Sequence, residues 1–95
     1  METKYEISLK MKTLKGITEY GCFPIGLDST FAVNLFSLLE GTSDISEGSM
    51  ITMDLVKWEA GIPYPMILIH CTYQQLAVNT KLITKELFKY FNLEK

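Results

Sequence analysis

The side chains best suited to nucleophilic and acid–base chemistry near neutral pH are few: two cysteines, Cys22 and Cys71, and one histidine, His70. A cysteine nucleophile needs a general base within hydrogen-bonding reach and a third group that orients the base. His70 and Cys71 are adjacent, and neighbouring side chains of a β-strand point to opposite faces of its sheet. They cannot readily share a proton. Cys22 could instead reach His70 across a sheet, with Glu19 or Asp54 as the orienting carboxylate. Cys22, His70 and Glu19 are the candidates for a small enzyme site.

No metal or cofactor motif accompanies these side chains. Cysteine and histidine ligands of a metal recur at short fixed spacings, and Cys22, His70 and Cys71 have none of them. The chain also lacks a glycine-rich loop of the kind that binds nucleotide phosphates. We therefore predict no catalytic, cofactor-binding or metal-binding residues. We expect a structural role for His70, and both cysteines reduced and packed as small hydrophobic side chains.

The charged residues disfavour binding to nucleic acids. Arginine, the residue that dominates such recognition, is absent, and the chain carries a net charge of −2. Lys81, Lys85 and Lys89 recur at every fourth position, which is typical of the solvated face of a helix. The two ends of the chain are mildly basic and residues 16–80 are acidic. This uneven distribution favours steering of a partner, without identifying one.

Hydrophobic alternation predicts two strands in the first part of the chain. Apolar and polar residues alternate strictly over residues 4–12, which predicts a strand with one buried and one solvated face. Gly16 suits a turn, and residues 17–25 are expected to return as a second strand. Gly21 and Pro24 weaken that strand, so we expect a bulge or an edge position there.

Two further strands are predicted in the second half, over residues 50–58 and 64–72. The third strand places Thr52 and Asp54 on the face opposite to its apolar residues. The fourth is apolar on both faces, so we expect residues 66–71 inside the sheet. Replacing Ile67 or Leu68 by alanine should then cost roughly 2–5 kcal/mol of stability.

Helical spacing predicts one helix over residues 29–40, with Gly41 as its C-terminal cap. Its expected core-facing residues are Phe31, Leu35, Leu38 and Leu39. A second helix should begin after Thr72, which forms a capping-box pattern with Gln75. Asn79 and Thr80 favour helix ends over helix interiors, so residues 72–92 form either one helix or two. A polar, acidic loop is expected over residues 42–49.

These elements predict a single α+β domain over residues 1–95. The order β-β-α-β-β-α implies a mainly antiparallel four-stranded sheet with both helices on one face. A shift of 45 residues aligns the Gly-Ile pairs at 16 and 61 and the Ala-Val-Asn triplets at 32 and 77, so an internal duplication stays open. No segment has the length of a membrane helix and no signal peptide is visible, so we expect a cytoplasmic protein.

Surplus apolar side chains predict a function in protein association. Val33 and Phe36 lie outside the expected core-facing arc of the first helix, so they are candidate interface residues of a homodimer. Trp58 and Tyr64 flank a proline-containing loop and are candidate binding residues. We predict an association module that binds a second copy or another protein, without a membrane or nucleic acid.

Two alternatives stay open beside this prediction. One is a small enzyme with a site around Cys22 and His70, although the lack of a catalytic motif favours a protein that is not an enzyme. The other is a ligand-binding protein whose uncovered sheet face is lined by Trp58, Tyr64 and Tyr5. Either would place function on the sheet instead of the first helix.

Overall fold

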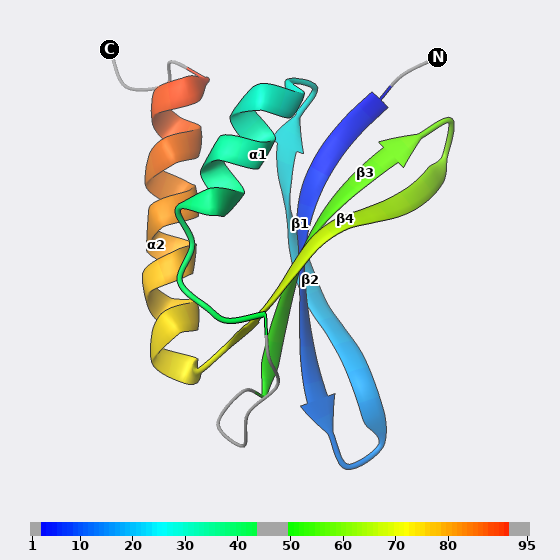
Figure 1. The fold of residues 1–95 in the computed structure, drawn as a ribbon, viewed down its shortest axis with the longest axis vertical. Helices are drawn as coiled ribbons and strands as arrows, with labels where there is room; N and C mark the ends of the chain where they lie inside the picture. The colour runs from blue at the N-terminus through cyan, green and yellow to red at the C-terminus, as the bar shows by residue number, and fades with distance from the viewer. Residues whose placement is uncertain (1–2, 44–49, 92–95) are drawn as a thin grey trace.

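Two strands pair at the centre of the molecule and two more flank them. The computed structural model describes residues 3–43 and 50–91, so residues 44–49 of the predicted acidic loop lie outside the described residues. The central strands are β1 (Thr3–Thr13) and β3 (Ile51–Glu59). The outer strands are β2 (Gly16–Gly26) and β4 (Ile62–Cys71), and the sheet is antiparallel throughout, in the order β2-β1-β3-β4 (Figure 1).

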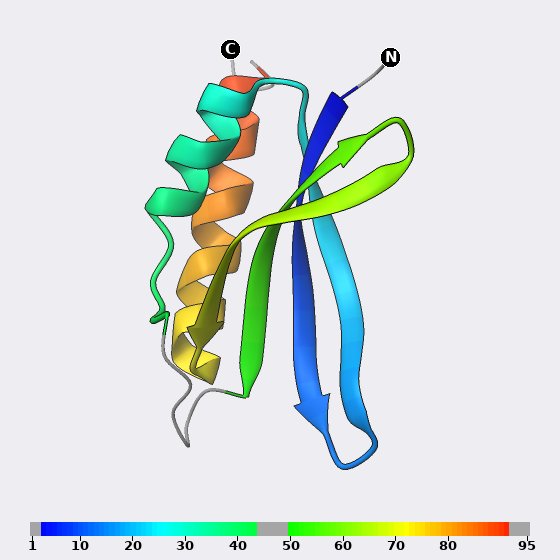
Figure 2. The ribbon, with the colours of Figure 1, turned by 45° about the vertical axis from the view of Figure 1, so that its right-hand side comes forward.

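Both helices, α1 (Ser29–Ser37) and α2 (Tyr73–Tyr90), lie on one face of the sheet (Figure 2). The predicted α+β fold is thus confirmed. α2 is one continuous helix, and its predicted capping box is present: Thr72 Oγ1 accepts from Gln75 N at 3.2 Å and Gln75 Oε1 accepts from Thr72 N at 2.9 Å. The opposite face of the sheet carries no helix among the described residues, and we call it the open face.

The hydrophobic core lies between the helices and the sheet. Side chains of all four strands and both helices meet there, and the fully buried ones include Ile7, Ile25, Ala32, Leu35, Leu55 and Ile83. The alternation in β1 and β3 is the cause, because every second residue points toward the helices. The predicted dry faces of these two strands are confirmed.

The predicted orientation of α1 is wrong in part. Phe36 is only 3 % exposed and packs in the core, whereas Leu38 lies beyond the last residue of the helix and is 56 % exposed. The helix buries Ala32, Leu35 and Phe36, which follow the i, i+3, i+4 rule. Val33 is partly buried against the same core. Phe36 is therefore covered by its own chain, and the basis for an interface at this residue is lost.

The predicted central position of the fourth strand is also wrong. β4 lies at the edge of the sheet, because its hairpin partner β3 already pairs with β1 on the other side. Ile67 and Leu68 are exposed, so the loss of 2–5 kcal/mol expected for their replacement by alanine does not apply. A loss of stability of that size is expected instead for alanine replacement of Met53 or Leu55 in β3, since both are fully buried. At the other edge, the predicted irregularity of β2 is confirmed by two register shifts.

Asn79 fixes the segment that follows α1. Its side-chain amide forms two hydrogen bonds with the backbone of Glu40, accepting from the N–H at 2.7 Å and donating to the C=O at 2.8 Å. The Cys71 thiol donates to the same carbonyl at 3.3 Å. Asn79 is fully buried, so an asparagine that could have interrupted α2 instead joins it to the distant α1 connection.

Gly41 allows this segment to approach β4 closely. The prediction that Gly41 is a left-handed helix cap is wrong. Gly41 is required for another reason, since a Cβ atom there would lie 2.9 Å from the carbonyl oxygen of His70. The next residue, Thr42, pairs with His70 through two backbone hydrogen bonds of 3.0 and 2.7 Å. The free edge of β4 is therefore covered at its C-terminal end.

We expect Asn79→Ala to lower the free energy of unfolding by roughly 1–3 kcal/mol, because the backbone N–H and C=O of Glu40 would both lose their bonds to the buried Asn79 amide. Asn34→Ala is the matched control, since Asn34 is exposed and ends the corresponding Ala-Val-Asn triplet in α1. Its effect should stay within about 0.5 kcal/mol. Urea unfolding measures both values, and equal losses would contradict the role assigned to Asn79.

The C-terminal end of α2 packs against the start of α1. The ring of Tyr90 stacks on Phe31 with centroids 3.8 Å apart, and its hydroxyl donates to Asp28 Oδ2 at 2.8 Å. Asp28 also caps α1 by accepting from Phe31 N at 3.1 Å. The hydrogen bond from Tyr90, followed by that from Phe31, lowers the pKa of Asp28 below its ordinary value.

We therefore expect Asp28→Asn to reduce the loss of folding stability that occurs as the pH is lowered into the acidic range. Because the pKa of Asp28 is lower in the folded state, its carboxylate stabilises the fold above the ordinary value of 3.8, and this contribution is lost as the pH falls through the folded pKa. Asparagine can still cap the helix. The urea midpoints of the wild type and the variant should differ near neutral pH and converge well below the ordinary pKa. A constant difference would contradict the assignment.

Candidate functional site

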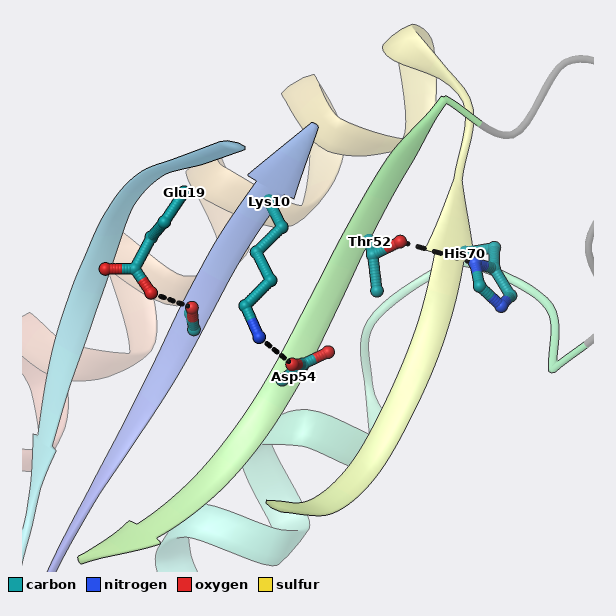
Figure 3. Close-up of polar contacts among 6 residues, drawn as sticks. Lys10, Glu19, Thr52, Asp54 and His70 are labelled. Atoms are coloured by element: carbon teal, nitrogen blue, oxygen red, sulfur yellow. Dashed lines mark hydrogen bonds and ion pairs between the residues drawn. The ribbon is translucent and has the colours of Figure 1, made fainter. Parts of the chain in front are cut away.

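Polar side chains join all four strands across the open face. Ser8 Oγ donates to Glu19 Oε1 at 2.9 Å and Lys10 Nζ donates to Asp54 Oδ2 at 2.9 Å (Figure 3). Thr52 Oγ1 and His70 Nδ1 lie 3.4 Å apart, which completes the connection to β4. We call these six residues the polar ladder: Ser8, Lys10, Glu19, Thr52, Asp54 and His70.

Strand register and one bulge place these side chains together. Lys10 lies opposite Thr52 and Asp54 lies opposite Ser8, so the Lys10–Asp54 ion pair joins diagonal neighbours on adjacent strands. In β2 the register shifts by one residue at Tyr20, which brings Glu19 opposite Lys10. Without this bulge Tyr20 would take the position of Glu19. Sequence alternation alone could not have shown that Glu19 joins the ladder.

A hollow of about 400 Å³ lies in the open face beside the Lys10–Asp54 pair. One part of its lining is polar and consists of Glu6, Ser8, Lys10, Glu19 and Asp54. The other part is apolar and consists of Val56, Trp58, Pro63 and Pro65. The polar part carries three carboxylates against a single ammonium group, so the hollow is acidic at one end and apolar at the other.

Two buried polar atoms in this lining have no hydrogen-bond partner among the described residues, Asp54 Oδ1 and Trp58 Nε1. Asp54 is only 3 % exposed, although it stands on the open face. Its second oxygen points away from Lys10 and toward β4 (Figure 3). Each unpaired buried polar atom lowers folding stability by roughly 1–3 kcal/mol. The binding of a group that supplies the missing partner is therefore favourable.

The structure separates the candidate catalytic residues. Cys22 lies opposite Ser8 on the edge strand β2, and His70 lies opposite Thr52 on the other edge strand. Three strand spacings lie between the two edges, about 14 Å in all. Glu19 is likewise on β2 and accepts from Ser8. A Cys22–His70 pair is therefore not assembled, and no group of three or more His, Cys, Asp or Glu residues within the described chain could hold a metal ion.

The two cysteines lie in different environments. Cys71 is buried, as predicted, whereas Cys22 is exposed on β2, so the prediction that both cysteines pack as hydrophobic side chains is wrong for Cys22. A hydrogen bond to Glu6 is the main cause that raises the pKa of the Cys22 thiol, and burial raises the pKa of Cys71. Both side chains are therefore thiols near neutral pH, the unreactive form.

The predicted aromatic surface does not form as one site. Trp58 lies opposite Pro63 on the open face, whereas Tyr64 lies opposite Lys57 on the other face. Tyr5 shares the face of Lys57 and is buried in the core. Of the three aromatic residues only Trp58 lines the hollow. The sequence signal that could have marked this place is Asp54, a carboxylate between the apolar residues Met53 and Leu55.

No protein-family model matches the chain, and neither a curated protein nor a solved structure matches it. Neither α1 nor α2 combines the length and the apolar composition that a helix needs to cross a bilayer.

We expect Cys22 to react slowly with iodoacetamide for an exposed thiol, because its raised pKa leaves little thiolate near neutral pH. Glu6→Gln should speed this alkylation, since the change removes the negative charge beside the thiol. Mass spectrometry of the native protein follows the rate. Glu86→Gln, on α2, is the control. An unchanged rate in the Glu6 variant would contradict the assigned cause.

Proposed function

We propose that this chain is a protein-association module, which binds another protein through the open face and the adjoining side chains of β4. The observation that carries the proposal is a row of large apolar side chains along β4 that are 40–53 % exposed. They are Ile62, Tyr64, Met66, Ile67 and Leu68. Leu68 lies opposite Asp54 on the open face, whereas Ile62, Tyr64 and Ile67 lie on the face of the helices, so the row covers both sides of this edge strand. Exposed apolar surface of this kind is typical of protein interaction sites.

The backbone of β4 is protected against pairing with another strand. Pro63 and Pro65 have no N–H group, so over this part of the free edge the donors that a further strand would need are missing. Met66 is the extra residue of a bulge opposite Leu55 and Val56. Thr42 covers the edge at His70. β4 therefore offers its side chains to a partner, and edge-to-edge joining of two copies is disfavoured.

Charge also favours a different protein over a second copy. A twofold dimer through the open face would bring the hollow of one copy toward the hollow of the other, with Glu6, Glu19 and Asp54 on both sides. Like charges oppose that arrangement. The expected homodimer through α1 has lost Phe36 as its contact residue. A partner with basic side chains complements the hollow, and the cytoplasmic location of the complex stays a prediction.

We expect Leu68→Asp to weaken binding of such a partner at least tenfold, because burial of a large apolar side chain contributes roughly 1.5–3 kcal/mol. Val78→Asp is the matched control, since Val78 on α2 is 47 % exposed, close to the 45 % of Leu68. The tagged chain would capture the partner from an extract of its native host. The purified partner would then be titrated against the wild type and both variants.

Two results would overturn the proposal. Equal binding of the partner to the Leu68 and Val78 variants would remove β4 from the interface. Sedimentation of the wild type as a dimer that Leu68→Asp dissociates would assign this surface to a second copy instead of another protein. Circular dichroism of each variant would confirm that it is folded.

A further inference from the structure

We infer that the hollow receives one cationic side chain, lysine or arginine, with Asp54 as its main acceptor. The identity of the partner that presents this side chain rests on the proposed function. Occupation of the hollow by a cation does not, because a small molecule can test it directly. The inference is built from the acceptor, the charge around it and the apolar end of the hollow.

Asp54 is an acceptor with one position left. Lys10 occupies Oδ2 at 2.9 Å, whereas Oδ1 is buried and has no partner among the described residues. A carboxylate in such a place binds a charged donor more strongly than a neutral one. The oxygen is turned toward β4, whose prolines form part of the hollow (Figure 3). An ammonium or guanidinium group bound on this side would pair with Oδ1 and leave Lys10 on Oδ2.

The charge of the surrounding side chains selects a cation over an anion. Glu6 and Glu19 add two carboxylates to the lining, and the one ammonium group, that of Lys10, is already paired with Asp54. The local potential is negative and attracts a cation. An anionic group would meet three carboxylates and no unpaired positive charge among the lining residues.

The apolar end fits the stem of a long basic side chain. Val56, Trp58, Pro63 and Pro65 line the hollow next to its acidic part. Lysine and arginine bury their methylene groups on apolar surface while the charged end stays among polar groups. The tryptophan ring also attracts a cation placed over its face. A small inorganic cation would leave this apolar lining unused.

The test uses Trp58, because it is the single tryptophan of the chain and it lines the hollow. The probes are the N-acetyl methylamides of lysine and arginine. Those of norleucine, which is neutral, and glutamate, which is anionic, are the comparison compounds. Each is titrated into the folded protein at low salt, since salt screens the interaction. The Trp58 indole N–H signal is followed by nuclear magnetic resonance.

We expect a saturable shift of the indole signal with a cationic probe, at an affinity about tenfold above that for norleucine. Lysine and arginine probes together show which cation is preferred. Asp54→Asn, which still offers an oxygen to Lys10, should lower the affinity for the cationic probe roughly tenfold. Glu86→Gln, on α2, removes a carboxylate away from the hollow and should leave the affinity unchanged.

Asp54 is buried, so its variant could fail to fold. Glu19→Gln is the second test, because Glu19 is exposed on β2 and glutamine can still accept from Ser8. Glu19→Gln should lower the affinity for the cationic probe severalfold. Weakening that appears equally in Glu86→Gln would reflect the net charge of the protein and would overturn the inference.

Three further outcomes would overturn it. The first is that neither cationic probe binds more tightly than the norleucine probe. The second is that the glutamate probe binds most tightly of all. The third is that a folded Asp54→Asn variant binds the cationic probe as tightly as the wild type. Each is distinct from failure of the proposed function. A partner that depends on Leu68 while no cation enters the hollow would leave the association surface in place and remove only the cation pocket.

Discussion

The antiparallel pairing of β1 with β3 is the interaction on which both faces of the molecule depend. Because Ser8 lies opposite Asp54 and Leu9 lies opposite Met53, one register places a polar pair on the open face and an apolar pair in the core. A slip by one residue would exchange the two faces along the whole strand. The Lys10–Asp54 ion pair, diagonal across the same two strands, is compatible with this register and helps to specify it.

The contacts of Asn79 extend this arrangement to the helices. Its two hydrogen bonds with Glu40 hold the end of the α1 connection beside α2, and Gly41 and Thr42 carry the chain onto β4 at His70. The same short segment therefore covers the end of the core and the end of the sheet edge. The uncovered apolar row begins where this cover ends, so its extent is set by the α1 connection as well as by the composition of β4.

The order of the elements could be predicted because periods of two and of 3.6 residues are written into β1, β3 and α2. The position of β4 could not, since apolar residues on both faces of a strand indicate burial and an interaction surface equally well. Helical spacing misplaces Phe36 because it counts Leu38 and Leu39 as helical, whereas the helix ends at Ser37 and its buried arc is centred on residues before them. Alternation in β3 predicts Asp54 on the polar face of its strand, but Glu19 comes opposite Lys10 only through the bulge at Tyr20.

The two prolines of β4 have a consequence for the protein before it meets any partner. An apolar strand at a sheet edge is ordinarily a template on which further chains stack into fibrils. Pro63 and Pro65 interrupt the ladder of donors that such stacking requires, while they leave the apolar side chains beside them exposed. The chain can thus keep apolar side chains exposed on this strand and still resist amyloid growth along it.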